Sequence, residues 1–169
     1  EGFALDAADW RPRRESDLYQ YCYHVAGAVG VMMAVVMGVP ADDDATLDRA
    51  CDLGLAFQLA NIARDIAEDD AAGRCYLPDD WLAMLDIAPG EHMKPHNRKK
   101  LALIGRWLAD EAEQYEASAR VGAKHLPLRA RWAVLSAAGI YGEIARKVRA
   151  AQAHAWDQRI FTSRPEKFR

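Results

Sequence analysis

The sequence lacks the features that define several large classes of protein. Only three cysteines occur in 169 residues, and they are widely spaced without a CxxC pair. This usage is typical of reduced thiols in a cytosolic protein and implies no disulfide framework. The formal net charge of -3 provides no overall basic field, so nucleic acid is not expected as a partner. There is no GxxxxGKS loop and no GxGxxG fingerprint, so ATP binding and Rossmann-type nicotinamide binding have no support.

Long apolar runs are also few. The longest, from Val25 to Val39, has about 15 residues, which is fewer than the roughly 20 that a membrane-spanning helix needs. Three aspartates follow at positions 42–44, so we predict a buried helix here rather than a transmembrane segment. The predicted location is the cytoplasm. Peripheral contact with the inner face of the membrane stays open, because a protein that handles lipids can dock on a bilayer without spanning it.

The pattern of apolar residues is helical throughout. No stretch alternates apolar and polar residues as a half-buried strand does, so the fold is predicted to be all-α. Periodicity and the positions of Gly and Pro predict four long helices and one short helical turn. In chain order these are Ser16–Met37, Asp44–Asp70, the short turn Asp79–Leu85, Asn97–Gly122 and Pro127–Trp156. No repeat or linker divides the chain, so residues 1–169 are expected to form a single helical domain.

A stripe of polar residues interrupts the second predicted helix. Gln58, Asn61, Asp65 and Asp69 recur at intervals of three and four, so their side chains leave the same side of the helix. Polar residues that form a stripe along a helix usually face water. The alternative is a surface of hard oxygen donors suited to Mg²⁺, or to Mn²⁺ in its place, with a substrate diphosphate supplying further oxygens.

Two arginines lie close to this stripe. Arg64 adjoins Asp65 but points about 100° away around the helix, so it is a candidate both for a structural ion pair and for a diphosphate contact. Arg74 follows the helix in the segment GRCYLP, where a turn would fold it back over bound phosphate. Both are therefore candidate substrate-binding residues.

Two blocks of sequence carry a specific resemblance to a known family. They are YCYHVAGAVG at Tyr21–Gly30 and LGLAFQLANIARDIAEDDAAGRCYLP at Leu53–Pro78, and they resemble the squalene and phytoene synthase family. The opening EGFALD, the segment IYGEIARKVR and the later QRIFTSRPEK extend the similarity over nearly the whole chain. The resemblance implies an isoprenoid-synthase-type helical bundle in which two aspartate-rich motifs face each other across a cavity. Only the second motif occurs here, so the chain resembles the C-terminal part of such an enzyme and is expected to be a truncated or processed piece.

The resemblance also implies an activity. It indicates a Mg²⁺-dependent prenyltransferase of carotenoid biosynthesis that joins two geranylgeranyl diphosphates head to head, through a cyclopropylcarbinyl diphosphate, to phytoene. No NADPH is expected for this reaction. The implied partners are the prenyl diphosphate substrates and the missing N-terminal half of the same fold. The isolated chain is expected to be inactive, because the first aspartate motif should precede Glu1.

The resemblance further implies roles for individual residues. The implied catalytic residues are Asp65, Asp69, Tyr21 and Tyr141, and the implied metal ligands are Asp65, Asp69 and Asn61. The implied substrate-binding residues are Gln58, Asn61, Arg64, Arg74, Val25, Val29, Gly30 and Arg159. Carbocation chemistry needs a dry cavity, because water would quench the cation, and facing aromatic rings lower its energy. Ordinary core packing stays the alternative for the tyrosines, the valines and Gly30, and a solvated tail stays the alternative for Arg159.

Two other functions stay open at this point. A related head-to-head synthase would use farnesyl diphosphate to make squalene or dehydrosqualene, and squalene formation would also need a reductant such as NADPH. A different class of function is a non-catalytic helical partner or lipid-binding module, because half of the expected metal site is absent from the sequence.

Overall fold

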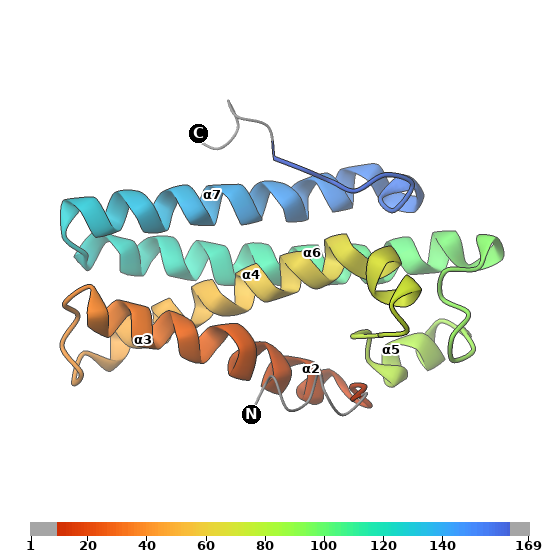
Figure 1. Cartoon of the computed structure of the whole chain (residues 1–169), viewed down its shortest axis with the longest axis horizontal. Coiled ribbons are helices and arrows are strands. Elements are labelled where there is room, and N and C mark those ends of the chain that lie inside the picture. Colours follow the sequence, from red (N-terminus) through yellow and green to blue (C-terminus); the bar gives the residue numbers. More distant parts are fainter. Residues whose placement is uncertain (1–9, 163–169) are drawn as a thin grey trace.

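The computed structural model describes residues 10–162 of the chain. This part consists of helices and connecting turns and contains no strand, which confirms the predicted all-α fold (Figure 1). The opening EGFALD and the end of the basic tail, both used in the family resemblance, lie outside the described residues.

Most of the predicted helices are present close to their predicted bounds. The helices are α2 (Glu15–Cys22), α3 (Ala28–Val36), α4 (Asp44–Ala71), α5 (Asp79–Met84), α6 (Arg98–Gly122) and α7 (Leu128–Ala151). Short 3₁₀ turns, η2 (Pro95–Asn97), η3 (Ala123–His125) and η4 (Gln152–His154), flank the last two helices. The prediction that the last helix reaches Trp156 is wrong, because the backbone leaves the helical region at Gln152, where φ is 51°.

The first predicted helix is also divided. Between α2 and α3 lies a π-helical turn, η1 (Tyr23–Gly27), in which the amide of Ala28 donates to the carbonyl of Tyr23 five residues earlier. A π turn of this kind inserts one extra residue into the helical path. The periodicity of the sequence does not reveal it, because the run from Val25 to Val39 that follows has no polar residue to mark a change of phase.

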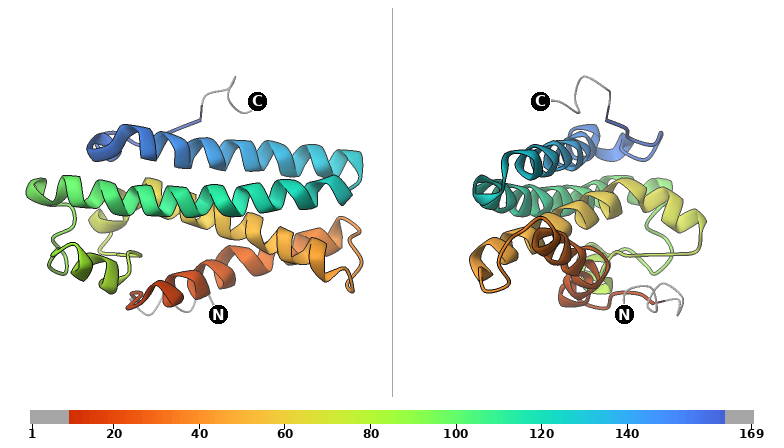
Figure 2. Two further views of the ribbon diagram at one scale, coloured as in Figure 1. Left: turned by 180° about the vertical axis from the view of Figure 1, so that it is seen from behind. Right: turned by 60° about the vertical axis from the view of Figure 1, so that its left-hand side comes forward.

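Helix α4 occupies the centre of the arrangement. It packs against α3, α6 and α7, and α6 and α7 lie side by side and antiparallel (Figures 1 and 2). Buried side chains of α2, α4, α6 and α7 meet in one main core, whose fully buried members include Leu18, Leu59, Leu101, Ile104, Leu108 and Val148. Five residues beyond the end of α7, the Trp156 indole donates to the carbonyl of Ala63 at 2.9 Å and holds the segment after η4 against α4. The polar stripe of α4 therefore sits on the most central helix of the structure.

Helix α3 is less buried than the sequence predicts. Only Ala34 of this helix is buried, and Met32, Val35 and Val36 are exposed, with Val36 79% exposed. The reason is that α3 packs mainly against one long helix, α4, among the described residues. In the same residues no helix is both long and apolar enough to cross a membrane.

The contact between α3 and α4 depends on close approach of the two backbones. A Cβ atom on Gly30 would lie 2.2 Å from the carbonyl oxygen of Ala50, so no larger residue fits without moving a helix. Gly30 therefore has a packing role in addition to any role in binding a substrate.

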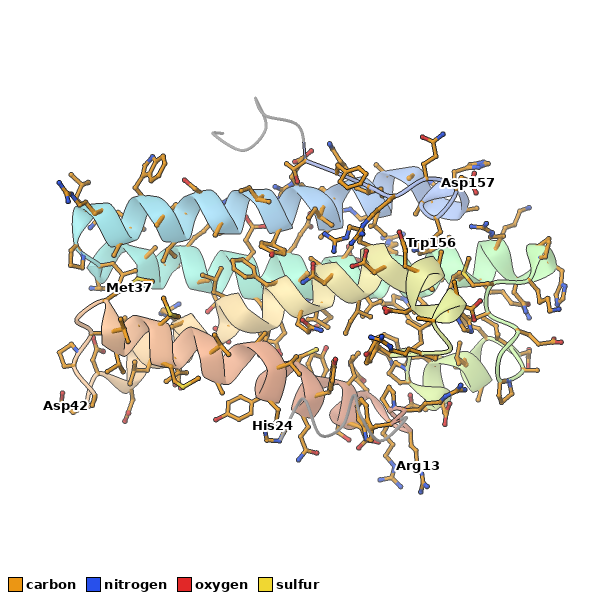
Figure 3. All side chains as sticks on the ribbon, viewed as in Figure 1. Arg13, His24, Met37, Asp42, Trp156 and Asp157 are labelled. Carbon is orange, nitrogen blue, oxygen red and sulfur yellow. The ribbon has the colours of Figure 1, made fainter. Side chains whose placement is uncertain are left out.

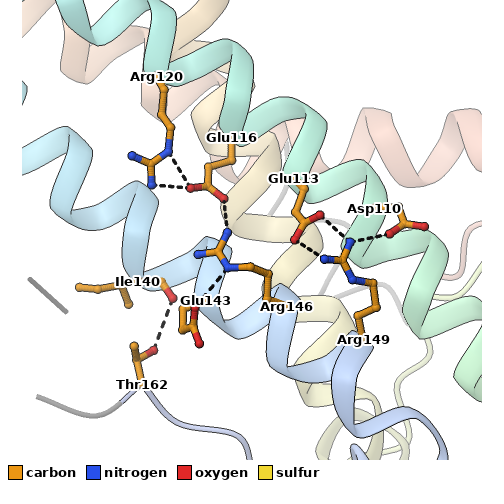
Figure 4. Close-up of polar contacts among 9 residues, drawn as sticks. All are labelled: Asp110, Glu113, Glu116, Arg120, Ile140, Glu143, Arg146, Arg149 and Thr162. Carbon is orange, nitrogen blue, oxygen red and sulfur yellow. Dashed lines mark hydrogen bonds and ion pairs between the residues drawn. The ribbon is translucent and has the colours of Figure 1, made fainter. Parts of the chain in front are cut away.

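The contact between α6 and α7 is polar as well as apolar. Alternating acidic and basic side chains connect the two helices (Figure 4). They are Asp110, Glu113, Glu116 and Arg120 on α6 and Glu143, Arg146 and Arg149 on α7. Glu116 is the buried member, with 4% exposure, and its carboxylate accepts from Arg120 at 2.6 and 2.8 Å and from Arg146 at 3.2 Å. Because a buried carboxylate needs partners, the bond that Arg146 of α7 donates to Glu116 of α6 holds the two helices together, while Arg120 supports Glu116 from the same helix.

The cysteines provide a direct test of the packing. All three are free thiols, and burial raises the pKa of the Cys22 thiol from 9.0 to about 12. Alkylation needs the thiolate, so we expect Cys22 to react with iodoacetamide at pH 8 at least about a thousandfold more slowly in the native protein than in denaturant. Site-resolved mass spectrometry measures this rate, with the half-buried Cys51 as an internal comparison. Equal labelling of Cys22 with and without denaturant would contradict the packing of α2.

Candidate functional site

An apolar cavity of about 410 Å³ lies between α3, α4, α7 and the end of α6. Its walls are mainly small or aliphatic residues, and Met37 at the end of α3 lies beside the turn between α6 and α7 (Figure 3). Three predicted substrate-binding residues, Val25, Val29 and Gly30, line it on the α3 side. The structure therefore brings these residues together around one hollow.

Helix α4 gives the cavity a polar end. Gln58 and Asn61 line the cavity, and Asp65 and Asp69 follow one and two turns further along the same side of the helix. The predicted polar stripe thus begins inside the cavity and continues beyond it. An apolar hollow therefore passes directly into an acidic surface along one helix.

The Asp65 carboxylate is held between two guanidinium groups. Arg64 donates to it through Nε at 2.7 Å and Nη2 at 2.5 Å, and Nη2 of Arg159 lies 3.1 Å from Oδ1. The hydrogen bonds that Arg64 donates to Asp65 raise the pKa of Arg64 above its ordinary value. The structural ion pair considered for Arg64 is therefore present, and Arg159 of the predicted tail reaches the stripe. Asp65 keeps 19% exposure of its side chain, so the group is accessible from outside.

The segment after α4 turns back toward the stripe, as predicted for Arg74. Gly73 adopts a positive φ of 75°, and the amide of Arg74 donates to the Asp69 carbonyl at 2.8 Å. Asp69, Arg74 and the buried His92 line a second, very small hollow of about 10 Å³ beside the helix end.

The two predicted tyrosines lie in different places. Tyr141 on α7 stacks on Phe57 of α4, with ring centroids 4.0 Å apart, and both rings line the cavity. Tyr21 is buried in a stack between Trp10 and Tyr76, at 5.2 and 5.0 Å, and does not line the cavity. Its place in the structure is that of a core residue behind the site.

The donor atoms of the stripe match the coordination chemistry of Mg²⁺. Carboxylates of Asp65 and Asp69 and side-chain amides of Asn61 and Gln58 are hard oxygen donors. Among residues 10–162, however, no three His, Cys, Asp or Glu side chains gather closely enough to hold a metal ion. The described residues thus supply at most part of a coordination sphere, and a substrate or further protein groups would have to supply the rest.

Several residues around the site were not predicted from the sequence. Phe57 lies one turn before Asn61 on the cavity side, and Thr46 and Arg49 line the opposite end of the cavity. Their spacing along α4 continues the pattern of the polar stripe backward, so the helical period was the signal that could have identified them.

Comparison with solved structures defines the class of protein first. The fold matches a dehydrosqualene synthase with a TM-score of 0.86 and 32% identity, covering 98% of this chain and 58% of that one. A squalene synthase from Alicyclobacillus acidocaldarius matches in fold, with a TM-score of 0.73, 20% identity and coverage of 84% and 53%. The helices around the cavity therefore form part of the helical fold found in these synthases.

Sequence comparison then identifies the family. The squalene/phytoene synthase family profile matches residues 1–166, and the chain belongs to this family. A 15-cis-phytoene synthase from Enterobacter agglomerans is 54% identical over 166 residues, which are 98% of this chain and 56% of the relative. One from Pantoea ananas is 53% identical over 167 residues, covering 99% and 53%. The chain thus spans about half the length of these curated relatives.

Proposed function

We propose that this chain is the C-terminal part of a phytoene synthase that acts in carotenoid biosynthesis. The observation that carries the proposal is the apolar cavity whose polar end, Gln58 and Asn61, continues into the Asp65 and Asp69 stripe. The chain is more than 50% identical in sequence to two 15-cis-phytoene synthases, which supports phytoene as the product. The structural similarity to a dehydrosqualene synthase supports the same class of head-to-head reaction. It also supports the second candidate function, in which the substrate is the shorter farnesyl diphosphate.

The proposed reaction joins two geranylgeranyl diphosphates without any oxidant or reductant. The C–O bond of one substrate breaks and releases diphosphate, and the double bond of the other attacks the allylic cation. Loss of a proton closes a cyclopropane and gives a cyclopropylcarbinyl diphosphate. A second C–O cleavage releases the other diphosphate, and rearrangement with loss of a second proton gives phytoene.

The polar stripe is proposed to bind the diphosphate end of the substrate. Asp65 and Asp69, with Asn61, would hold Mg²⁺, or Mn²⁺ in its place, which supplies positive charge against the departing diphosphate. Arg64 and Arg159 already contact Asp65, so either guanidinium lies where a diphosphate oxygen would accept a hydrogen bond. Arg74 lies at the helix end beside Asp69 and would contact the same group.

The apolar cavity is proposed to hold a prenyl chain and to exclude water from the cation. Val25 and Val29 line the cavity with aliphatic side chains, and Gly30 leaves space beside them. Tyr141, stacked on Phe57, provides aromatic faces close to the polar end. Such faces lower the energy of a cation and offer it no nucleophile. For Tyr21 the packing supports a positioning role behind the site rather than contact with the substrate.

The remaining donors and the cover of the cavity are proposed to come from an N-terminal half of the same fold. The exposed apolar residues of α3, Met32, Val35 and Val36, support this assignment, because a helix that is apolar on all sides is normally enclosed. The enzyme is proposed to be cytoplasmic with peripheral contact at the inner face of the membrane, because phytoene is a hydrocarbon.

Product analysis tests the proposal. The complete protein, incubated with geranylgeranyl diphosphate and Mg²⁺ but without NADPH, is expected to make phytoene, and the isolated 169-residue chain is expected to make almost none. Dehydrosqualene from farnesyl diphosphate, with no phytoene, would favour the second candidate. No product from any prenyl diphosphate, with the protein shown to be folded, would favour a non-catalytic lipid-binding role.

A further inference from the structure

The chain returns toward the polar stripe after its last helix. Beyond η4 the segment 157–162, called here the return segment, runs back along α7 (Figure 1). Trp156, directly before this segment, is docked on α4 through its hydrogen bond to the Ala63 carbonyl. Arg159 lies within the return segment, so a residue from near the end of the described chain is brought to the side of α4 that carries Asp65.

Two hydrogen bonds hold the far end of the return segment on α7. The Lys147 ammonium donates to the Phe161 carbonyl at 2.9 Å. The Thr162 hydroxyl donates to the Ile140 carbonyl at 3.4 Å (Figure 4). The segment is therefore attached at both ends, and Arg159 is held beside the stripe between the two attachments.

Arg159 contacts two carboxylates of α4. Its Nη2 lies 3.1 Å from Oδ1 of Asp65, and its Nε lies 3.8 Å from Oε1 of Glu68. Nε of Arg64 donates to the same Oδ1 of Asp65 at 2.7 Å. Two guanidinium nitrogens, one from each arginine, therefore lie close to a single oxygen of a proposed metal ligand.

A divalent cation at Asp65 would meet both of these positive charges. Mg²⁺ coordinates carboxylate oxygens directly, at about 2.1 Å, so at Asp65 it would be close to each guanidinium group. Like charges at short range repel, and the repulsion is stronger where water is partly excluded. The Asp65 side chain is only 19% exposed. One of the two arginines is therefore expected to withdraw when the cation binds.

Arg159 has the weaker hold on Asp65. Arg64 donates to both oxygens of the carboxylate, at 2.7 and 2.5 Å, from the neighbouring position of the same helix. The Arg159 side chain is 45% exposed, compared with 16% for Arg64. Because exposed ion pairs contribute little to stability, the contact of Arg159 is the one that a cation would displace.

We propose that Arg159 competes with the divalent cation for Asp65 and thereby regulates metal binding at this site. The inference rests on the proposed function, in which Asp65 is a ligand of Mg²⁺, and adds a regulatory contact to it. A substrate diphosphate offers new oxygen acceptors to the guanidinium that leaves Asp65. Cation and diphosphate therefore favour each other's binding, because one takes Asp65 and the other takes Arg159.

Manganese binding tests the competition in the complete protein. Free Mn²⁺ is measured by electron paramagnetic resonance during titration of wild type, Arg159→Gln and Arg129→Gln, with no diphosphate present. Loss of a binding site in Asp65→Asn identifies the site that is measured. Arg159→Gln is expected to lower the Kd of this site for Mn²⁺ at least about threefold.

Arg129→Gln is the matched control. It removes the same charge from an exposed residue of α7, about 27 Å along the helix axis from Lys147, so it should keep the wild-type Kd. An equal or higher Kd in folded Arg159→Gln protein overturns the inference. The lack of any Asp65-dependent site in both wild type and Arg159→Gln overturns it as well.

A second measurement on wild type decides the question if circular dichroism shows that Arg159→Gln is unfolded. Phenylglyoxal modifies accessible guanidinium groups, and site-resolved mass spectrometry follows Arg159 and Arg129 separately. Mn²⁺ is expected to raise the modification rate of Arg159 at least about twofold and to leave that of Arg129 unchanged. In that case an unchanged rate at Arg159 overturns the inference. Neither measurement needs a prenyl substrate, so a wild type that makes no phytoene contradicts the proposed function, whereas Mn²⁺ binding still decides the role of Arg159.

Discussion

Replacement of Asp65 by alanine is expected to lower product formation by the complete protein at least about a hundredfold. Asp65 is the carboxylate on which Arg64 and Arg159 converge, and it is a proposed ligand of the metal. Its loss removes a proposed metal contact and leaves two arginines without their shared partner. The rate is measured as phytoene formed from geranylgeranyl diphosphate with saturating Mg²⁺.

Asp48→Ala is the matched control for this change. Asp48 is an exposed aspartate on the same helix, about 26 Å along the axis from Asp65, so its loss should leave the rate unchanged. Circular dichroism and thermal melting show whether Asp65→Ala is folded, and Asp65→Asn retains the shape of the side chain without its charge. Wild-type rates in both Asp65 variants would remove this residue from the proposed catalytic site.

The change Gly142→Ala is expected to lower the free energy of unfolding by about 2–4 kcal/mol. A Cβ atom there would lie 1.9 Å from Oε2 and 2.4 Å from Cδ of Glu116. The carboxylate cannot simply rotate away, because it is buried and bonded to Arg120 and Arg146. Either these bonds break or α6 and α7 move apart. Urea denaturation of the complete protein measures the loss.

Gly139 provides the comparison on the same helix. A Cβ atom at Gly139 meets only Nη2 of Arg120, at 3.9 Å, so Gly139→Ala should be neutral or stabilising by up to about 1 kcal/mol. In a Glu116→Ala background, Gly142→Ala should cost less than about 1 kcal/mol, because the clashing carboxylate is gone. Equal costs in both backgrounds would show that Gly142 is constrained by something other than Glu116.

The features that depend on residues within a single helix or turn could be predicted from the sequence. The stripe Gln58, Asn61, Asp65 and Asp69 needs only the helical period, and the turn that returns Arg74 needs only Gly73. The helix bounds likewise follow breakers such as Gly38 and Pro40.

Other features depend on contacts between distant segments, so single-helix patterns could not predict them. The position of Tyr21 between Trp10 and Tyr76 needs the loop after α4 to return beneath α2. The position of Arg49 in the cavity wall depends on Ser118, 69 positions away. The helix break at Gln152 accompanies the docking of Trp156 on Ala63, a contact that spans 93 positions.

The π turn at Tyr23–Gly27 sets the rotational phase between α2 and α3. A helix with one extra residue emerges rotated by about 100° relative to an uninterrupted one. With that offset α2 directs Leu18 and Cys22 into the main core, while α3 directs Gly30 against Ala50. Deletion of one residue in this turn would restore a regular helix and rotate Val29 and Gly30 off the cavity wall. The lining of the cavity is therefore as sensitive to a single-residue gap in this short segment as to a substitution within the lining itself.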